Sequence, residues 1–279
     1  MKNFITRTLT GIVYVVLLVG CTLWNPLSAY IFFALVAAAA VWEFGSVANK
    51  HYGASVNRPI TAMAAIILCG IVWLMQIGSG TTARMMGLYG FSLLYIIITE
   101  LYRNEKDALK NWTLAFASQV YVALPFALIP TMSVGYDPMA QQLTYDGLVP
   151  LSVFIFLWAS DSGAYLVGSL LGKYIPYKLF PRISPNKSWV GSIGGGLIAV
   201  IAALVIAHFA PSYPTLKWVG LALVVTVFGT WGDLVESLIK RQLGIKDSGK
   251  ALPGHGGFLD RFDSALLAIP AAAIYLAIV

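Results

Sequence analysis

The chain has 279 residues, of which 58% are hydrophobic and only 11% are charged, and its formal net charge is +6. A soluble domain usually carries about a quarter charged residues, so this composition, with a mean hydropathy of +0.78, excludes an ordinary soluble protein and indicates one whose solvent is lipid. The net positive charge favours anionic lipid head groups, and we expect no nucleic acid as a partner.

Nine apolar segments follow one another along the chain, and each is a candidate for a membrane-spanning helix of roughly 20 residues. Their apolar runs are continuous and do not alternate, which argues against the strands of a membrane barrel. The expected spans are residues 8–24, 27–47, 60–77, 86–101, 112–130, 148–170, 192–209, 218–238 and 264–279. The predicted fold class is therefore all-α, a polytopic integral membrane protein with about nine transmembrane helices.

The basic residues of the loops indicate an orientation. With nine spans, sixteen of the 18 Lys and Arg residues lie on the N-terminal side of the membrane, and only Arg84 and Lys217 lie on the other. The positive-inside rule then places the N-terminus in the cytoplasm and the C-terminus outside. The loop 131–147, which has no Lys or Arg, is expected outside as a connector.

The N-terminal segment allows a second interpretation. Lys2 and Arg7 precede an apolar run that ends at Cys21, a pattern that also resembles a lipoprotein signal whose cleavage would remove the first span. A first transmembrane helix explains the same pattern, and we prefer it. Cys21 and Cys69 lie in separate apolar segments without metal-ligand spacing, so they suggest neither a zinc site nor a disulfide framework. The compact length suits a bacterial inner-membrane protein.

The polar residues divide this single membrane domain into two regions. Residues 1–150 hold about five spans with short loops and are expected to provide the scaffold and lipid access. Residues 151–279 hold about four spans and the cytoplasmic loops, with nearly all the polar groups inside or beside spans. We expect the chemistry in this second region.

The eighth span carries a row of charged residues. Asp233, Glu236, Ser237 and Lys240 have the spacing i, i+3, i+4 and i+7, which places all four on one helix face. A carboxylate in a span costs at least a few kcal/mol unless it has a partner, water or a metal ion. A Glu236–Lys240 ion pair with a hydrogen-bonded Asp233 is one interpretation, and a functional site is the other.

A glycine-rich loop and an acidic segment follow this span. Glycines at 249, 254, 256 and 257 surround His255 and would let the backbone approach a ligand closely, as phosphate-binding loops require. Asp260 and Asp263 come next, and Asp260 alone is explained as a helix N-cap. Together with Asp233 and Asp247, these carboxylates and the basic residues around them suit a nucleoside triphosphate with Mg²⁺, which prefers oxygen ligands.

A second polar group lies upstream. Asp161 falls within the sixth span and is followed by Gly168 and Gly172 at a spacing that allows close helix packing. The next cytoplasmic loop is basic and contains Ser184 to Ser188, followed by a glycine-rich run at 191–196. Such a loop is either a topology signal or a binding site for phosphate oxygens.

The segment from Ser237 to Asp263, SLIKRQLGIKDSGKALPGHGGFLDRFD, closely resembles the signature of phosphatidate cytidylyltransferases, also called CDP-diglyceride synthases. Two further stretches, Asp161–Tyr165 and Ser184–Trp189, resemble the other shared segments of that family and occur in the expected order. Val190 departs from the resemblance, because many relatives have a polar residue there.

The resemblance implies a Mg²⁺-dependent condensation of CTP with phosphatidic acid at the cytoplasmic face, giving CDP-diacylglycerol and pyrophosphate. A second metal ion or a monovalent cation is left open, and a homodimer is expected. Asp233 and Asp260 are the implied metal ligands, with Asp263 as a further ligand or an anchor. Lys187, Lys240 and Arg241 would act in catalysis by neutralising phosphates. The implied substrate contacts are Asp161, Ser184, Lys187, Ser237, Lys240, Arg241, Lys246, Asp247, His255 and Arg261.

Two alternatives remain at this point. One is a CTP-using enzyme that acts on another lipid, such as an ether lipid or a polyprenol. The other is a cation-coupled transporter in which Asp161, Asp233 and Glu236 form an ion path. A transporter favours charges near the bilayer midplane in repeated halves, whereas these charges cluster at one face and no internal repeat is evident.

Overall fold

The computed structural model describes residues 2–103, 107–137, 142–210, 212–249 and 256–279. The chain forms two compact units, and each is described by itself. Unit 1 contains Met1–Leu148 and Leu243–Phe262, whereas unit 2 contains Val149–Gln242 and Asp263–Val279. Most of the segment between the last two spans therefore belongs with the N-terminal helices, although it directly follows a helix of unit 2.

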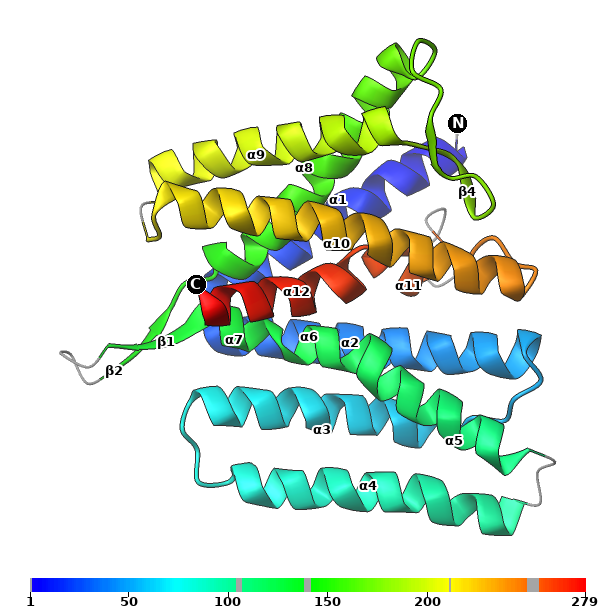
Figure 1. Ribbon diagram of the computed structural model, residues 1–279. Coiled ribbons are helices and arrows are strands. Elements are labelled where there is room, and N and C mark those ends of the chain that lie inside the picture. The colour runs from blue at the N-terminus through cyan, green and yellow to red at the C-terminus, as the bar shows by residue number, and fades with distance from the viewer. Residues whose placement is uncertain (1, 104–106, 138–141, 211, 250–255) are drawn as a thin grey trace. The chain divides into compact units, whose positions relative to one another are not determined.

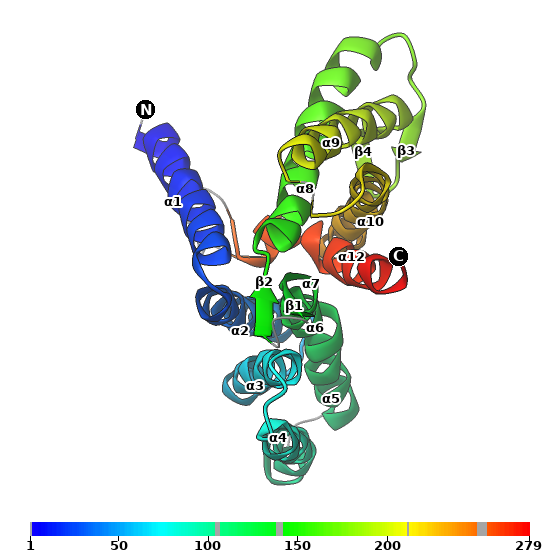
Figure 2. The same ribbon diagram turned by 90° about the vertical axis from the view of Figure 1, so that its left-hand side faces the viewer.

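Unit 1 begins with four long helices, of which α2, α3 and α4 lie side by side with alternating directions (Figures 1 and 2). They are α1 (Lys2–Trp24), α2 (Pro26–His51), α3 (Arg58–Gln76) and α4 (Thr82–Arg103). The start of α2 shows why one helix ends and the next begins. The Asn25 side chain accepts the N–H of Ser28 at 2.8 Å, the Ser28 hydroxyl accepts the N–H of Asn25, and Pro26 occupies the first turn. This reciprocal capping fixes the helix start.

The fifth span is interrupted by prolines. It consists of α5 (Ala108–Ala117), a π-helical turn η1 (Ser118–Ala123), α6 (Leu124–Ala127) and α7 (Ile129–Ser133). Pro125 and Pro130 cannot donate a backbone hydrogen bond and would clash with the carbonyl four residues earlier in a regular helix. The wider turn before Pro125 and the break before α7 relieve that conflict.

Two short antiparallel hairpins lie between the spans. In unit 1, β1 (Val134–Asp137) pairs with β2 (Gln142–Tyr145), so the expected outer connector contains a hairpin. In unit 2, β3 (Lys178–Phe180) pairs with β4 (Ser184–Ser188). Both hairpins are formed by residues of the loops, so the spans themselves stay helical.

Unit 2 contains the remaining long helices, and α10 contacts both α9 and α12 (Figure 2). The helices are α8 (Leu148–Leu171), α9 (Trp189–Phe209), α10 (Thr215–Gln242) and α12 (Ala265–Ile278). The last span, Leu259–Ile278, begins with the short helix α11 (Leu259–Phe262) in unit 1 and continues as α12 in unit 2.

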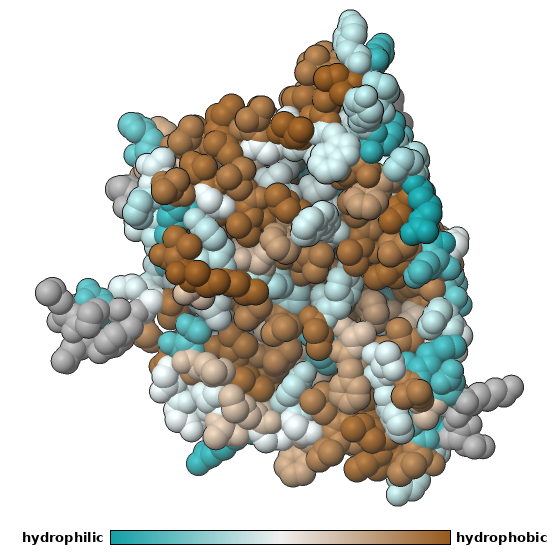
Figure 3. All heavy atoms as spheres, viewed as in Figure 1, coloured by the Kyte–Doolittle hydropathy of each residue, from teal (hydrophilic) through white to brown (hydrophobic). Residues whose placement is uncertain are grey.

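The helices have the length and surface of membrane spans. In the described part of the chain, eight helical segments are long and apolar enough to cross a bilayer, and α1 has a shorter apolar stretch, Thr8–Trp24. Large apolar side chains face outward, such as Phe91 on α4, 72% exposed, and Leu197 on α9, 63% exposed. Figure 3 shows these apolar surfaces along the helices. Outward apolar side chains suit a lipid solvent, and the predicted all-α polytopic fold is confirmed.

Candidate active site

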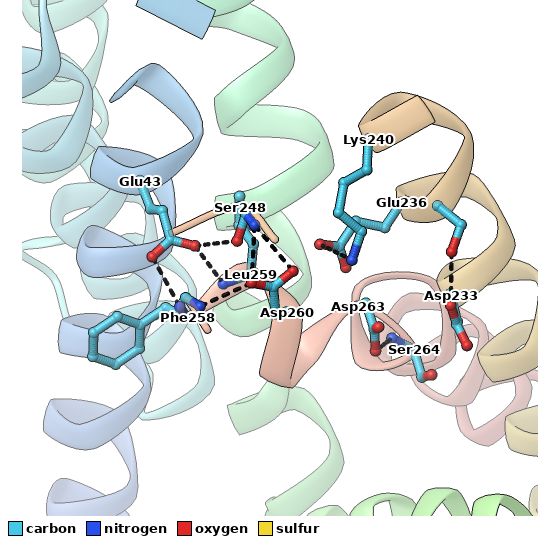
Figure 4. Close-up of polar contacts among 12 residues, drawn as sticks. Glu43, Asp233, Glu236, Lys240, Ser248, Phe258, Leu259, Asp260, Asp263 and Ser264 are labelled. Atoms are coloured by element: carbon cyan, nitrogen blue, oxygen red, sulfur yellow. Dashed lines mark hydrogen bonds and ion pairs between the residues drawn. The ribbon is translucent and has the colours of Figure 1, made fainter. Parts of the chain in front are cut away.

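The charged face of α10 forms as its spacing predicts. The Ser237 hydroxyl donates to Oδ1 of Asp233 at 3.1 Å, and Lys240 Nζ lies 3.2 Å from Oε1 of Glu236 (Figure 4). The Glu236 side chain is only 6% exposed and that of Lys240 is 15% exposed. The Glu236–Lys240 ion pair is therefore confirmed, and it supplies the partner that a buried carboxylate needs.

Asp233 has a second partner that its own helix does not provide. Lys187, on β4, places its ammonium group 2.5 Å from Oδ2 of Asp233. The Asp233 side chain keeps about a third of its surface exposed, at 30%. The basic loop that contains Lys187 thus reaches the charged face of α10. The Asp233 carboxylate binds both the Ser237 hydroxyl and the Lys187 ammonium group.

Small residues explain how α8 and α9 come close together beside this pair. A side-chain carbon on Gly195 would lie 2.5 Å from the backbone oxygen of Ser160, and one on Gly191 would lie 3.0 Å from that of Ala164. Gly168 faces Gly191 at the same contact. Glycine is therefore required for this close backbone approach, and Ser188 fixes the start of α9 by accepting the N–H of Gly191 at 3.1 Å.

A cavity of about 490 Å³ opens where α8, α9 and β4 meet. Its volume falls in the range of about 300–1,000 Å³ that is common for small-molecule sites. Its polar lining residues are Ser160, Asp161, Ser169, Asn186, Lys187, Ser188, Ser192 and Thr230. Asp161 and Lys187, two of the sequence-predicted site residues, thus share one hollow in unit 2.

Asp263 joins the same group through a close approach of backbones. A side-chain carbon on Gly232 of α10 would lie 2.7 Å from the backbone oxygen of Asp263. This contact brings Asp263 near enough to Asp233 for their charges to interact, and Asp161 interacts with Asp233 in the same way. Three carboxylates, from α8, α10 and the turn just before α12, therefore lie near enough to interact with one another, with Lys187 and Lys240 beside them.

The residues of this group suit a divalent cation by their chemistry. Asp233 already binds a cationic group, the Lys187 ammonium, and Asp161 and Asp263 supply further oxygen atoms of the kind that Mg²⁺ prefers. In the described part of the chain, no three His, Cys, Asp or Glu side chains converge closely enough to hold a metal ion in this arrangement. The donor types fit Mg²⁺, and the ligand set stays a prediction.

Asp260 lies in unit 1, and its carboxylate accepts hydrogen bonds from backbone N–H groups. Its Oδ2 accepts the N–H groups of Gly257 at 2.8 Å and Ser248 at 2.9 Å, and its Oδ1 lies 3.2 Å from the latter nitrogen. Asp260 is 9% exposed. Because Asp260 and Asp233 belong to different units, their predicted sharing of a magnesium ion also stays a prediction.

The other predicted residues are more exposed or lie outside the described structure. Arg241, Lys246, Asp247 and Arg261 are exposed. Ser184 begins β4 and is half-buried. His255 lies outside the described residues.

A buried carboxylate of unit 1 contacts the signature segment, and no sequence pattern singled it out. Glu43 of α2, 8% exposed, accepts the N–H groups of Phe258 at 2.9 Å and Leu259 at 3.1 Å, and the hydroxyl of Ser248 (Figure 4). The available signal was a glutamate within an apolar span, because such a residue needs a polar partner. Sequence spacing gave no indication that the partner lies more than 200 residues away.

The fold and the site define a polytopic membrane protein with a cavity and a group of charged side chains among its helices. Comparison with known proteins then assigns the family: the chain matches the model of the cytidylyltransferase family over residues 5–279 and belongs to that family. A phosphatidate cytidylyltransferase of Staphylococcus aureus is 33% identical over 276 residues, covering 97% of this chain and 98% of that protein. That of Staphylococcus epidermidis is 34% identical over 274 residues, with the same coverage of both chains.

Proposed function

We propose that this protein is a membrane-embedded enzyme that condenses CTP with phosphatidic acid to give CDP-diacylglycerol and pyrophosphate. The observation that carries the proposal is the family match over nearly the whole chain. The relatives' names supply the substrates, and their Staphylococcus sources support a bacterial enzyme. The Asp161 and Lys187 cavity supplies a place for a phosphorylated ligand in the region where the sequence predicts the chemistry.

The reaction needs charge neutralisation more than a strong base. An oxygen of the lipid phosphate forms a new bond to the α-phosphorus of CTP, and the bond from that phosphorus to the bridging oxygen breaks, so that pyrophosphate leaves with the electron pair. A phosphate monoester has its second pKa near 6 and is largely ionised at neutral pH. The main barrier is therefore the approach of two anions, which positioned cationic groups lower.

The residues of unit 2 suit this task. Lys187 and Lys240 are held by carboxylates, Asp233 and Glu236, so their ammonium groups are positioned before a substrate arrives. Incoming phosphate oxygens would compete with these carboxylates for the ammonium protons. The Ser237 hydroxyl fixes the Asp233 carboxylate on its other side. Preorganised groups of this kind cost little reorganisation during the reaction.

We further propose that Mg²⁺ is required and that, as the family resemblance implies, Asp233 and Asp260 would hold it, with Asp263 as a further ligand or an anchor. A bound Mg²⁺ would draw charge from the triphosphate oxygens and help to orient them. The activity should vanish in EDTA and return with added Mg²⁺. Retained activity after complete chelation would refute the metal requirement.

The cytoplasmic placement of the site and a bacterial inner-membrane location are also proposals, based on the loop charges. CTP would arrive from water, and phosphatidic acid would enter laterally with its acyl chains in lipid. The homodimer rests on the family resemblance alone, and crosslinking of the protein in native membranes tests it.

The substrate assignment is tested with purified protein, radiolabelled CTP and a panel of lipid acceptors. We expect label in lipid product with phosphatidic acid, together with release of pyrophosphate. Transfer to an ether lipid phosphate or a polyprenyl phosphate, with none to phosphatidic acid, would select the alternative substrate class. The absence of CTP turnover with every acceptor would refute the enzymatic proposal.

A further inference from the structure

Glu43 holds both described arms of the segment that links α10 to the last span. The first arm, Leu243–Gly249, presents the Ser248 hydroxyl to Glu43, and the second arm, Gly256–Phe262, presents the N–H groups of Phe258 and Leu259. All of these residues belong to unit 1. A buried carboxylate with three donors is well compensated, so this contact is a built interaction and not an incidental one.

The backbone of both arms is shaped to receive this carboxylate. A side-chain carbon on Gly249 would lie 2.6 Å from Oε2 of Glu43, and one on Gly257 would overlap the carboxylate directly. Gly256 has a φ of 83°, in the region that favours glycine. The glycines that the sequence suggested for close approach to a phosphate therefore include two that closely approach Glu43.

A second carboxylate completes the connection between the arms. Asp260 accepts the N–H of Ser248 from the first arm and the N–H of Gly257 from the second. Ser248 thus bridges two carboxylates, donating its hydroxyl to Glu43 and its N–H to Asp260. Asp260 ties the arms to each other, whereas Glu43 ties both arms to α2.

The end of the second arm has an independent anchor. The ring of Phe262 packs edge-on against Phe126, with centroids 5.2 Å apart, and against Tyr14, with centroids 5.6 Å apart. Phe262 is 2% exposed. Apolar packing therefore keeps the arm attached to unit 1 without Glu43, so the glutamate's contribution is the placement of the polar backbone around 248 and 257–259.

We infer that Glu43 is a positioning residue for the cytidylyl transfer: by binding Ser248, Phe258 and Leu259, it fixes the backbone of the arms 243–249 and 256–262, which this function requires for the binding of CTP. The inference rests on the proposed function and on the substrate contacts that the family resemblance implies in this segment, among them Lys246 and Asp247. Neither the family name nor the spacing of the signature points to α2. Glu43 acts through the backbone of the segment and is not itself placed against a substrate.

The test is Glu43→Gln in the full-length protein, assayed in mixed micelles with CTP and phosphatidic acid. The amide keeps the volume but replaces one acceptor oxygen by a donor, which in either orientation faces a backbone N–H, that of Phe258 or that of Leu259. We expect KM for CTP to rise by about tenfold, with KM for phosphatidic acid unchanged. Simple loss of folded enzyme would lower the apparent kcat and leave both KM values unchanged, so the split separates positioning from stability.

Glu100→Gln is the matched control. Glu100 is another buried carboxylate in a span of unit 1, 7% exposed, and it binds Arg103 and Asn111 at 2.8 Å each. Its replacement should leave KM for CTP within about twofold of the wild type, because none of its hydrogen-bond partners belongs to the segment. An equal rise in KM for CTP in both variants would overturn the inference, since it would indicate general damage to unit 1.

Two variants of Ser248 provide a milder probe if Glu43→Gln folds poorly. Ser248→Ala removes one hydrogen-bond donor to Glu43 and should also raise KM for CTP, but by a smaller factor. Ser248→Thr keeps the hydroxyl, so its KM for CTP should be close to that of the wild type. The double variant with Glu43→Gln should show less than the product of the two separate effects, as expected for contacting groups. Fully independent effects, or no effect of Ser248→Ala, would contradict the proposed contact.

Hydrogen exchange of peptides from 243–249 and 256–262 supplies a readout that needs no enzymatic reaction. We expect faster exchange in Glu43→Gln than in the wild type or Glu100→Gln. Unchanged exchange and unchanged KM would overturn the inference. Faster exchange with unchanged KM would also overturn the positioning role and would count against the segment binding CTP. A wild-type protein that never used CTP would refute the proposed function separately, and the exchange data would still decide whether Glu43 holds the segment.

Discussion

Four of the described carboxylates differ in their partners, and the difference suggests different functions. Asp233 and Glu236 bind ammonium groups, whereas Glu43 and Asp260 bind backbone N–H groups. A lysine that binds a carboxylate can exchange it for a substrate phosphate, because both are anions with oxygen acceptors. A backbone N–H that binds a carboxylate fixes the path of the chain. We therefore expect the lysines bound by Asp233 and Glu236 to act on the substrate directly and the Glu43 contacts to maintain the site, whereas Asp260 also has the predicted role of a metal ligand.

Lys187 and Lys240 should act through charge. Replacing either with Gln keeps much of the side-chain length but removes the ammonium group, and we expect weaker CTP or phosphatidate binding, lower turnover, or both, by about 10- to 100-fold in kcat/KM. Steady-state kinetics with each substrate varied in turn provides the measurement.

Lys178→Gln is the control for Lys187, because Lys178 is an exposed lysine on the same hairpin. It should retain wild-type kinetics and expression. Full activity in both Lys187→Gln and Lys240→Gln would mean that the basic loop acts only as a topology signal.

Asp260→Asn separates a metal ligand from a backbone anchor. The amide oxygen can take the place of Oδ2, which accepts the shorter bonds from Ser248 and Gly257, while the amide nitrogen replaces the oxygen with the longer 3.2 Å contact. Backbone anchoring should therefore largely survive, whereas a Mg²⁺ ligand would lose its charge. We expect a nearly inactive enzyme with reduced Mg²⁺-dependent CTP binding. Wild-type turnover at ordinary Mg²⁺ would remove Asp260 from the ligand set.

At the scale of elements, glycines on α9 and α10 determine which polar groups meet. The α8–α9 approach at Gly191 and Gly195 places Asp161 at a cavity that also contains Lys187, and the approach at Gly232 brings Asp263 near Asp233. Close helix contacts of this kind need small residues because a side chain would separate the backbones. The site thus depends on residues that carry no reactive group.

Gly232→Ala should damage the site by steric displacement. The added methyl group would lie 2.7 Å from the Asp263 oxygen and 2.9 Å from that of Ser264, so the start of α12 must shift. We expect a loss of about 1–3 kcal/mol in stability, as for overpacked cores, and a clear fall in kcat. Thermal unfolding in detergent and steady-state assays measure the two effects.

Gly196→Ala is the matched control in unit 2, because its added carbon would meet only Thr226 at an ordinary 3.7 Å. It should be close to wild type in both assays. If Gly232→Ala were equally silent, the contact between α10 and the start of α12 would have no role in placing Asp263.

The sequence predicted elements well where a local pattern determines them. The apolar runs predicted the spans, and the spacing of Glu236 and Lys240 predicted their ion pair, because both depend on neighbours in one helix. The Lys187–Asp233 pair and the partners of Glu43 depend on how distant segments fold together. No periodicity in a single sequence specifies such contacts, and the hairpin β3–β4, which carries Lys187, was not expected either.

At the scale of the whole molecule, the distribution of charge constrains the protein more than any one residue does. The outward faces of the helices are apolar, and the carboxylates buried in them have cationic or backbone partners, as a lipid solvent requires. The site predicted from the sequence draws on residues of both units, Asp260 in unit 1 and Asp233 in unit 2. The Asp260→Asn experiment tests whether Asp260 has the ligand role that the sequence predicts.

The final prediction concerns the orientation of the whole chain in the membrane. Sixteen of the 18 basic residues fall on the N-terminal side if the apolar stretch Thr8–Trp24 of α1 counts as a full span together with the eight candidate spans. A reporter that is active only outside the cytoplasm should then be active when fused after Val279 and inactive when placed in the loop 102–111. A reporter active only in the cytoplasm should give the opposite pattern. A cytoplasmic C-terminus would refute the nine-span topology with a cytoplasmic N-terminus, although the helices themselves would be unchanged.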